Sequence, residues 1–218
     1  MKMKALLVIP LLMLLNSCGE TEFPVSDSNE NGNKSFEQNG TALSTLSIER
    51  VNSDIKEGKV AGWNSAKTQQ ERYLALLNYF RSLPIICNDT KANRGPLESV
   101  EWSDALEAAA QEHSEDLLEH GVIGHRGSDG STAAQRVEAS GFEGEYISEN
   151  VGYKMKEGIP YNKKEWIENF VAWMQSKDGH CSNIMSKEYN RFGMAEAKSI
   201  EGESVTLYWT QDFGLSKD

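Results

Sequence analysis

Long apolar segments and clusters of basic residues are both missing from this sequence. The N-terminal apolar stretch from Ala5 to Leu15 is interrupted by Pro10 and is too short to span a bilayer, and charged residues break every later apolar run. No run of Lys and Arg occurs, and the formal net charge is -11. We therefore expect no binding to nucleic acid, and anionic lipid headgroups are poor partners for the same reason.

Several well-known catalytic and ligand-binding motifs are also absent. The sequence has no HExxH pair and no Gly-x-Ser-x-Gly elbow placed between a strand and a helix. The glycine-rich stretch from Gly127 to Thr132 lacks the lysine of a phosphate-binding loop and the ligand spacing of a calcium loop. Internal repeats are absent as well.

The N-terminus has the features of a processed export signal. Lys2 and Lys4 precede the short apolar stretch, which ends in Leu15-Asn16-Ser17-Cys18 and is similar to a bacterial lipobox. We expect residues 1–17 to be a lipoprotein signal peptide and Cys18 to carry the lipid anchor, with several acyl chains giving firm attachment. The protein would then be extracytoplasmic and anchored to a bacterial membrane, with the outer membrane or cell surface favoured. An ordinary cleaved signal is the alternative.

The composition changes again near residue 62. Residues 18–62 are rich in Ser, Asn, Gly, Thr and Glu without a sustained apolar period, which predicts a flexible tether with at most a short helix near Leu43 to Ile55. Residues 63–218 are long enough to form one ordinary domain with its own core.

Only three cysteines are present, and Cys18 is assigned to the anchor. Cys87 and Cys181 remain as an even pair in an exported protein, where an oxidising compartment permits a disulfide. Because the sequence does not show that their backbones approach each other, two buried free thiols remain an alternative.

Helical and strand patterns in the domain predict a mixed α and β fold, with helices first and strands near the C-terminus. Ser103 is the expected cap of the second helix, Gly121 its end, and Ser131 or Thr132 the cap of the third. His113 lies on the apolar stripe of the second helix, so we expect it in the core with a backbone carbonyl or water as partner. The predicted helices span Ser65–Ser82, Ser103–His120, Ala133–Ser140 and Lys163–Gln175, and the predicted strands span Arg191–Ala197 and Ser204–Phe213.

Five short segments in order resemble the successive signatures of the CAP superfamily, named for cysteine-rich secretory proteins, antigen 5 and pathogenesis-related 1. The resemblance covers roughly Ala66 to Gly214, and its Trp-x-x-Ser-x-x-Gly-His form is similar to the bacterial branch. The segments are Ala109–Ser114 (AAQEHS), Ile123–Arg126 (IGHR), Ser148–Gly152 (SENVG), Trp173–His180 (WMQSKDGH) and Tyr208–Gly214 (YWTQDFG).

The resemblance implies an α+β fold, a three-layer α-β-α sandwich with a central surface cleft. Many members hold two histidines and two glutamates in this cleft, and three of these positions match His125, Glu149 and His180. The fourth, a glutamate in eukaryotic members, falls on Ser176. The implied ligand cleft is therefore His125, Glu149, Ser176 and His180, and the missing glutamate weakens any metal affinity or acid–base chemistry carried over from those members.

Two imidazoles and a carboxylate form the ligand set of many divalent metal sites, and zinc is the expected metal. We therefore expect a binding module whose cleft takes a divalent metal through His125, Glu149 and His180, or a small-molecule or lipidic ligand. The alternatives are a metal-assisted, peptidase-like hydrolase of the cell envelope with Glu149 as base, and a surface protein that binds a protein partner and has a vestigial cleft. A further alternative is that the three residues form only a polar network in which Glu149 orients the histidines.

Overall fold

The computed structural model describes residues 46–158 and 164–217 of the chain. None of the helices in these two ranges is long and apolar enough to cross a membrane. The elements, in chain order, are α1 (Ile48–Lys56), α2 (Gln69–Arg81), β1 (Ile85–Ile86), β2 (Asn93–Arg94), β3 (Glu101–Trp102), α3 (Asp104–His120), α4 (Ala133–Ala139), β4 (Gly144–Lys156), α5 (Glu165–Gln175), α6 (His180–Ile184), β5 (Arg191–Glu201) and β6 (Ser204–Ser216).

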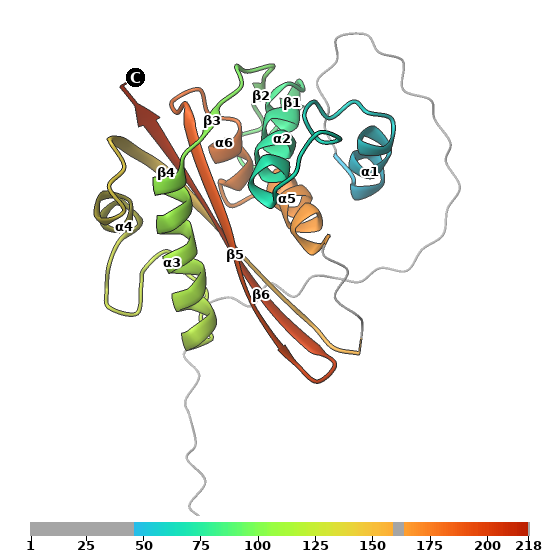
Figure 1. Cartoon of the computed structure of the whole chain (residues 1–218). Helices are drawn as coiled ribbons and strands as arrows, with labels where there is room; N and C mark the ends of the chain where they lie inside the picture. Colours follow the sequence, from blue (N-terminus) through green and yellow to red (C-terminus); the bar gives the residue numbers. More distant parts are fainter. Residues whose placement is uncertain (1–45, 159–163, 218) are drawn as a thin grey trace, which may run out of the picture. The chain divides into compact units, whose positions relative to one another are not determined.

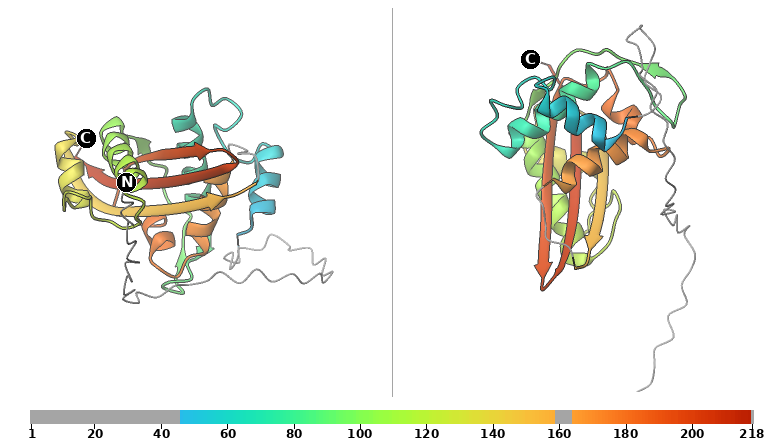
Figure 2. Two further views of the ribbon diagram at one scale, coloured as in Figure 1. Left: turned by 90° about the horizontal axis from the view of Figure 1, so that it is seen from below. Right: turned by 90° about the vertical axis from the view of Figure 1, so that its right-hand side faces the viewer.

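A four-stranded sheet in the order β3-β5-β6-β4 forms the middle layer of the domain. Strand β3 is parallel to β5, whereas β5, β6 and β4 pair antiparallel. Helices α3 and α4 cover one face of the sheet, and α1, α2, α5 and α6 lie toward the other (Figures 1 and 2). The predicted α+β class and its three layers are confirmed.

The helix boundaries follow from local capping. Ser103 Oγ accepts a hydrogen bond from the backbone N–H of Leu106, and α3 ends at Gly121, which adopts the left-handed conformation that favours glycine. Thr132 and Gln135 form a reciprocal capping box at the start of α4. These caps set where the loop between α3 and α4 begins and ends, and that loop carries His125.

Helix α3 packs directly against the backbone of the sheet. Ala109 and Ala110 are fully buried on its inner face. A Cβ added at Gly193 on β5 would lie only 2.2 Å from the backbone nitrogen of Glu107 and 2.3 Å from the carbonyl carbon of Leu106. The absence of a side chain at Gly193 is therefore what permits this close approach.

The folded domain begins earlier than the sequence predicts. Helix α1 lies inside the range 18–62 that was expected to be a tether, yet Leu46, Val51 and Val60 are buried in the main core. Buried Asp54 on α1 accepts a hydrogen bond from the hydroxyl of Tyr79 on α2. A short helix was expected near Leu43 to Ile55, but its packing into the core was not, because that packing depends on tertiary contacts such as these.

Strand β4 is the longest element that the sequence patterns miss. Glu149 lies in the middle of this strand and pairs with Asp212 of β6. Both Glu149 and Asn150 are buried, since helices cover both faces of the sheet here. A strand covered on both faces need not alternate between apolar and polar residues, so its period was not visible.

Candidate functional site

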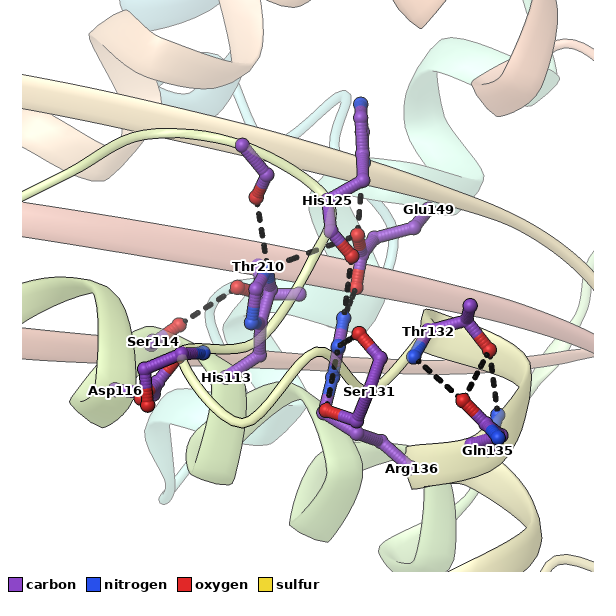
Figure 3. A network of polar contacts seen from close by, with 12 residues as sticks. His113, Ser114, Asp116, His125, Ser131, Thr132, Gln135, Arg136, Glu149 and Thr210 are labelled. Carbon is purple, nitrogen blue, oxygen red and sulfur yellow. Dashed lines mark hydrogen bonds and ion pairs between the residues drawn. The ribbon is translucent and has the colours of Figure 1, made fainter.

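The centre of the candidate site is the buried carboxylate of Glu149. Its Oε1 accepts a hydrogen bond from His125 Nδ1 at 2.8 Å, and its Oε2 accepts one from the guanidinium Nη2 of Arg136 at 2.7 Å. The side chains of Glu149 and Arg136 are 1% and 3% exposed. Figure 3 shows these three residues converging from β4, α4 and the loop after α3. Both oxygens of this carboxylate are therefore occupied by protein groups.

Arg136 was not predicted as a site residue, although it connects three parts of the site. Besides Glu149, its guanidinium donates to the backbone oxygens of His125 at 3.3 Å and Ser131 at 3.2 Å. Arg136 thus fixes the loop that carries His125 and also neutralises the charge of Glu149. An arginine in a short helix is usually a surface residue, so only the folded arrangement identifies it.

His125 is the accessible member of this network. Its side chain is 61% exposed, whereas Glu149 beneath it is enclosed. The hydrogen bond to Glu149 raises the pKa of His125, while burial of part of the ring acts in the opposite direction. Because Nδ1 is held by Glu149, Nε2 is the ring nitrogen left to contact a ligand.

His113 lies in the core, as its place on the apolar stripe of α3 predicts. Its Nε2 is hydrogen-bonded to the backbone oxygen of Gly124 at 2.8 Å and lies 3.8 Å from Glu149 Oε1. Burial lowers the pKa of His113, although the charge of Glu149 opposes that effect. His113 therefore supports the loop from beneath as a neutral ring and does not line the surface.

His180 begins α6, directly after Gly179, and its Nδ1 is hydrogen-bonded to Ser176 Oγ at 2.9 Å. Burial lowers the pKa of His180; Asp178 opposes this effect, and the charge of His125 lowers the pKa further. The two rings are thus near enough to interact electrostatically. The residue in place of the second glutamate, Ser176, holds His180 in the way that Glu149 holds His125. We call His125, Glu149, Ser176 and His180 the histidine site.

The position of α6 is set by a disulfide and by β4. Cys181, next to His180, is bonded to Cys87 with an S–S distance of 2.03 Å. Asn150 on β4 donates a side-chain hydrogen bond to the backbone oxygen of His180 at 3.3 Å. The backbone around His180 is therefore tied both to the sheet and to the segment after β1.

Asp212 is a second buried carboxyl group that sequence reasoning did not single out. It lies opposite Glu149 on β6, and neither of its oxygens has a hydrogen-bond partner among the described residues. Burial raises the pKa of Asp212 well above its ordinary value, and the charge of Glu149 raises it further, whereas Arg136 lowers it. Asp212 is therefore a buried carboxyl group beside an ionic network, in surroundings that favour its protonated form.

The residues predicted as metal ligands do not form a three-ligand site. Within residues 46–158 and 164–217, no group of three or more His, Cys, Asp or Glu side chains is arranged to hold a metal ion. At the histidine site, both oxygens of Glu149 are engaged by His125 and Arg136. Only the imidazoles of His125 and His180 remain as donors. Cys18, the predicted lipidation site, lies outside the described residues.

Comparison with known proteins gives a family match over most of the domain. Residues 74–213 match the cysteine-rich secretory protein family, CAP. No curated protein matches the sequence. The fold is similar to that of an extracellular protein containing an SCP domain from Bacillus anthracis, with 14% identity and a TM-score of 0.45 over 80% of this chain and 45% of that one. The present chain thus spans under half of the length of the Bacillus protein.

Two other solved structures are similar over part of the chain. An outer surface protein from Borrelia burgdorferi has 23% identity and a TM-score of 0.39, over 56% of this chain and 81% of that one. BmVAL-1 has 16% identity and a TM-score of 0.46, over 68% and 78% of the two chains.

Proposed function

Since the chain belongs to the cysteine-rich secretory protein (CAP) family, we propose that it is an extracytoplasmic binding protein whose ligand is held at the histidine site. The observation that carries this proposal is the engagement of both oxygens of Glu149 by His125 and Arg136. A carboxylate held in this way is suited to orienting an imidazole. It is poorly suited to accepting a proton from a water molecule.

This arrangement favours binding over hydrolysis. A hydrolase with Glu149 as its general base needs a carboxylate oxygen within reach of the attacking water. Here the carboxylate is buried beneath His125, and its negative charge is already paired with Arg136. The accessible groups are the exposed imidazole of His125 and the partly buried imidazole of His180, which can bind a ligand without a chemical step.

A divalent metal such as zinc remains the ligand to test first. Metal-bound histidines usually have the second ring nitrogen held by a carboxylate or another oxygen, which fixes the orientation of the ring. His125 and His180 have such partners in Glu149 and Ser176. We propose that zinc would contact these two imidazoles, with Glu149 orienting His125 and not coordinating. Two protein ligands should bind zinc more weakly than the three or four of established zinc sites.

Attachment to a membrane through Cys18 is part of the proposal. The apolar stretch and the lipobox-like Leu15-Asn16-Ser17-Cys18 support it. The Bacillus anthracis and Borrelia burgdorferi proteins, described as extracellular and as an outer surface protein, are compatible with an external location. Cys18→Ala should move the protein from the membrane fraction to the soluble fraction, and its retention in the membrane fraction would argue against the anchor.

The test of the histidine site is calorimetric titration of zinc into the purified full-length protein at neutral pH. We expect saturable binding of one zinc per chain, which the double variant His125→Ala, His180→Ala should lose. His120→Ala is the matched control, because His120 is exposed at the end of α3 and pairs with Asp116, away from the site. Zinc binding that persists in the double variant, or no binding at all, would contradict zinc as a ligand of this site.

A further inference from the structure

A second candidate site lies where the segment from Arg94 to Leu97, at the end of β2, meets the loop after α6. A pocket of about 270 Å³ opens there, with Leu97 and Met185 as its apolar wall. Its charged lining residues are Arg94, Lys187 and Glu188. The pocket shares no lining residue with the histidine site.

The two cations of this pocket have no acidic partner. Among the described residues, no ion pair involves Arg94 or Lys187, although the chain as a whole has a net charge of -11. The Nε of Arg94 is shielded from solvent and has no hydrogen-bond acceptor in the described part of the chain. A buried donor without an acceptor is costly, so this guanidinium lacks one oxygen that a ligand would provide.

A third positive charge lies just behind the pocket wall. Arg81 is 2% exposed, and its guanidinium donates only to backbone oxygens, those of Glu98 at 3.1 Å, Ile184 at 2.9 Å and Ser186 at 2.6 Å. No carboxylate among the described residues pairs with it. Its guanidinium also lies over the ring of Tyr189, 4.6 Å from the ring centroid. Because neither this ring nor the backbone oxygens carry a formal negative charge, Arg81 still adds to the positive field around the pocket.

The pocket wall is also fixed in place. Gly95 has a φ of +81°, and a Cβ there would lie 2.3 Å from the backbone oxygen of Leu83 and 3.0 Å from Met185 Cε. The backbone N–H of Leu97 donates a hydrogen bond to the backbone oxygen of Arg81 at 2.7 Å. The positive groups and the apolar wall are therefore held together by the same close packing.

We propose that this pocket binds a small carboxylate that carries a short apolar chain. The carboxylate would accept hydrogen bonds from Arg94 and contact Lys187, and the apolar chain would pack on Leu97 and Met185. A monoanion fits better than a phosphate dianion, because the carboxylate of Glu188 also lines the pocket and opposes a second negative charge.

The test is an NMR titration of the full-length protein with butyrate, following the backbone amide signals of Gly95 and Ser186. We expect a saturable shift, binding about tenfold weaker for acetate because two fewer methylene groups are buried, and no shift with the uncharged butyramide. Arg94→Gln and Lys187→Gln should each weaken butyrate binding by about tenfold or more. The matched control Lys217→Gln, an exposed lysine outside the pocket, should leave it unchanged.

Three results would overturn the proposal. One is the absence of a saturable shift at Gly95 and Ser186 at any accessible butyrate concentration. Another is butyrate binding that is unchanged in both single variants, Arg94→Gln and Lys187→Gln. The third is tighter binding of inorganic phosphate than of butyrate, which would identify a different anion as the ligand. None of these outcomes bears on zinc binding at the histidine site.

Discussion

Glu149 and Asp212 lie directly opposite each other on β4 and β6, but within the described residues only Glu149 forms an ion pair, with Arg136. Arg136 donates to Glu149, and Asp212 has no partner for either oxygen among the described residues. Two neighbouring carboxyl groups in a buried place seldom both ionise, because their charges repel. The two carboxyl groups therefore differ: Arg136 pairs with Glu149, whereas burial and the neighbouring carboxylate favour the protonated form of Asp212.

We predict that Asp212→Asn leaves the protein at least as stable as the wild type at pH 7. Because the pKa of Asp212 is raised in the folded protein, the folded state binds this proton more tightly than the unfolded chain does. Its contribution to stability is present in acid and declines as the pH rises above about 4. Urea unfolding at several pH values should show that Asp212→Asn lacks this decline. A variant clearly less stable than the wild type at pH 7 would contradict the assignment.

Removal of the cation should have a much larger effect. Arg136→Gln leaves Glu149 as a buried charge without its partner, and we expect a loss of about 3–5 kcal/mol in the free energy of unfolding. The control is Arg126→Gln, since Arg126 is exposed and bonds only to the backbone oxygen of Gly130. Chemical denaturation measures the free energy of unfolding of both variants. Equal small losses in the two variants would show that the buried ion pair is not needed for stability.

Gly193→Ala should destabilise the domain through overpacking. The added methyl group would meet the backbone of α3 at Leu106 and Glu107, which cannot turn aside as a flexible side chain would. We expect a loss of about 3 kcal/mol by urea unfolding. Gly124→Ala is a suitable comparison, because a Cβ at Gly124 meets no atom within 4 Å. A change of similar size at both positions would rule out the packing explanation.

Loss of the disulfide should lower stability through the unfolded state. Cys87 and Cys181 are separated by 94 residues, so the bond closes a long loop. Replacing both cysteines by serine should cost about 2–5 kcal/mol. The reduced wild-type protein should unfold like the variant, and intact-mass analysis of the oxidised protein should show two hydrogens fewer than the reduced form. Identical stability of oxidised and reduced protein would be evidence against this role.

Helices α3 and α4 could be predicted because local signals define them. Ser103 and Gly121 mark the two ends of α3, and Thr132 caps α4, as the residues around them suggest. Strand β4 gave no comparable signal, since buried Glu149 and Asn150 interrupt its apolar pattern. Where helices cover both faces of a strand, tertiary contacts determine which residues occupy it. The sequence of such a strand need not alternate between apolar and polar residues.

The same distinction applies to the site. His125, Glu149 and His180 were found through resemblance to a family, and the structure brings His125 and Glu149 into contact. Arg136 and Asp212 were missed, because an arginine in a short helix and an aspartate in a strand are ordinary surface residues in most proteins. Their burial arises only when α4 and β6 are placed beside β4. Sequence reasoning thus identified the two histidines and Glu149, but not Arg136 and Asp212, the buried groups beside Glu149.

The bond between Cys87 and Cys181 also bears on how the protein matures. The residue next to Cys181 is His180, so the covalent tie fixes the same helix that presents this imidazole. Such a bond forms only where thiols are oxidised. In a reducing cytosol both cysteines stay as free thiols. A newly synthesised chain would thus lack this constraint on His180 until it met an oxidant. Completion of the site would then be coupled to the delivery of the chain, and premature ligand capture during biosynthesis would be limited.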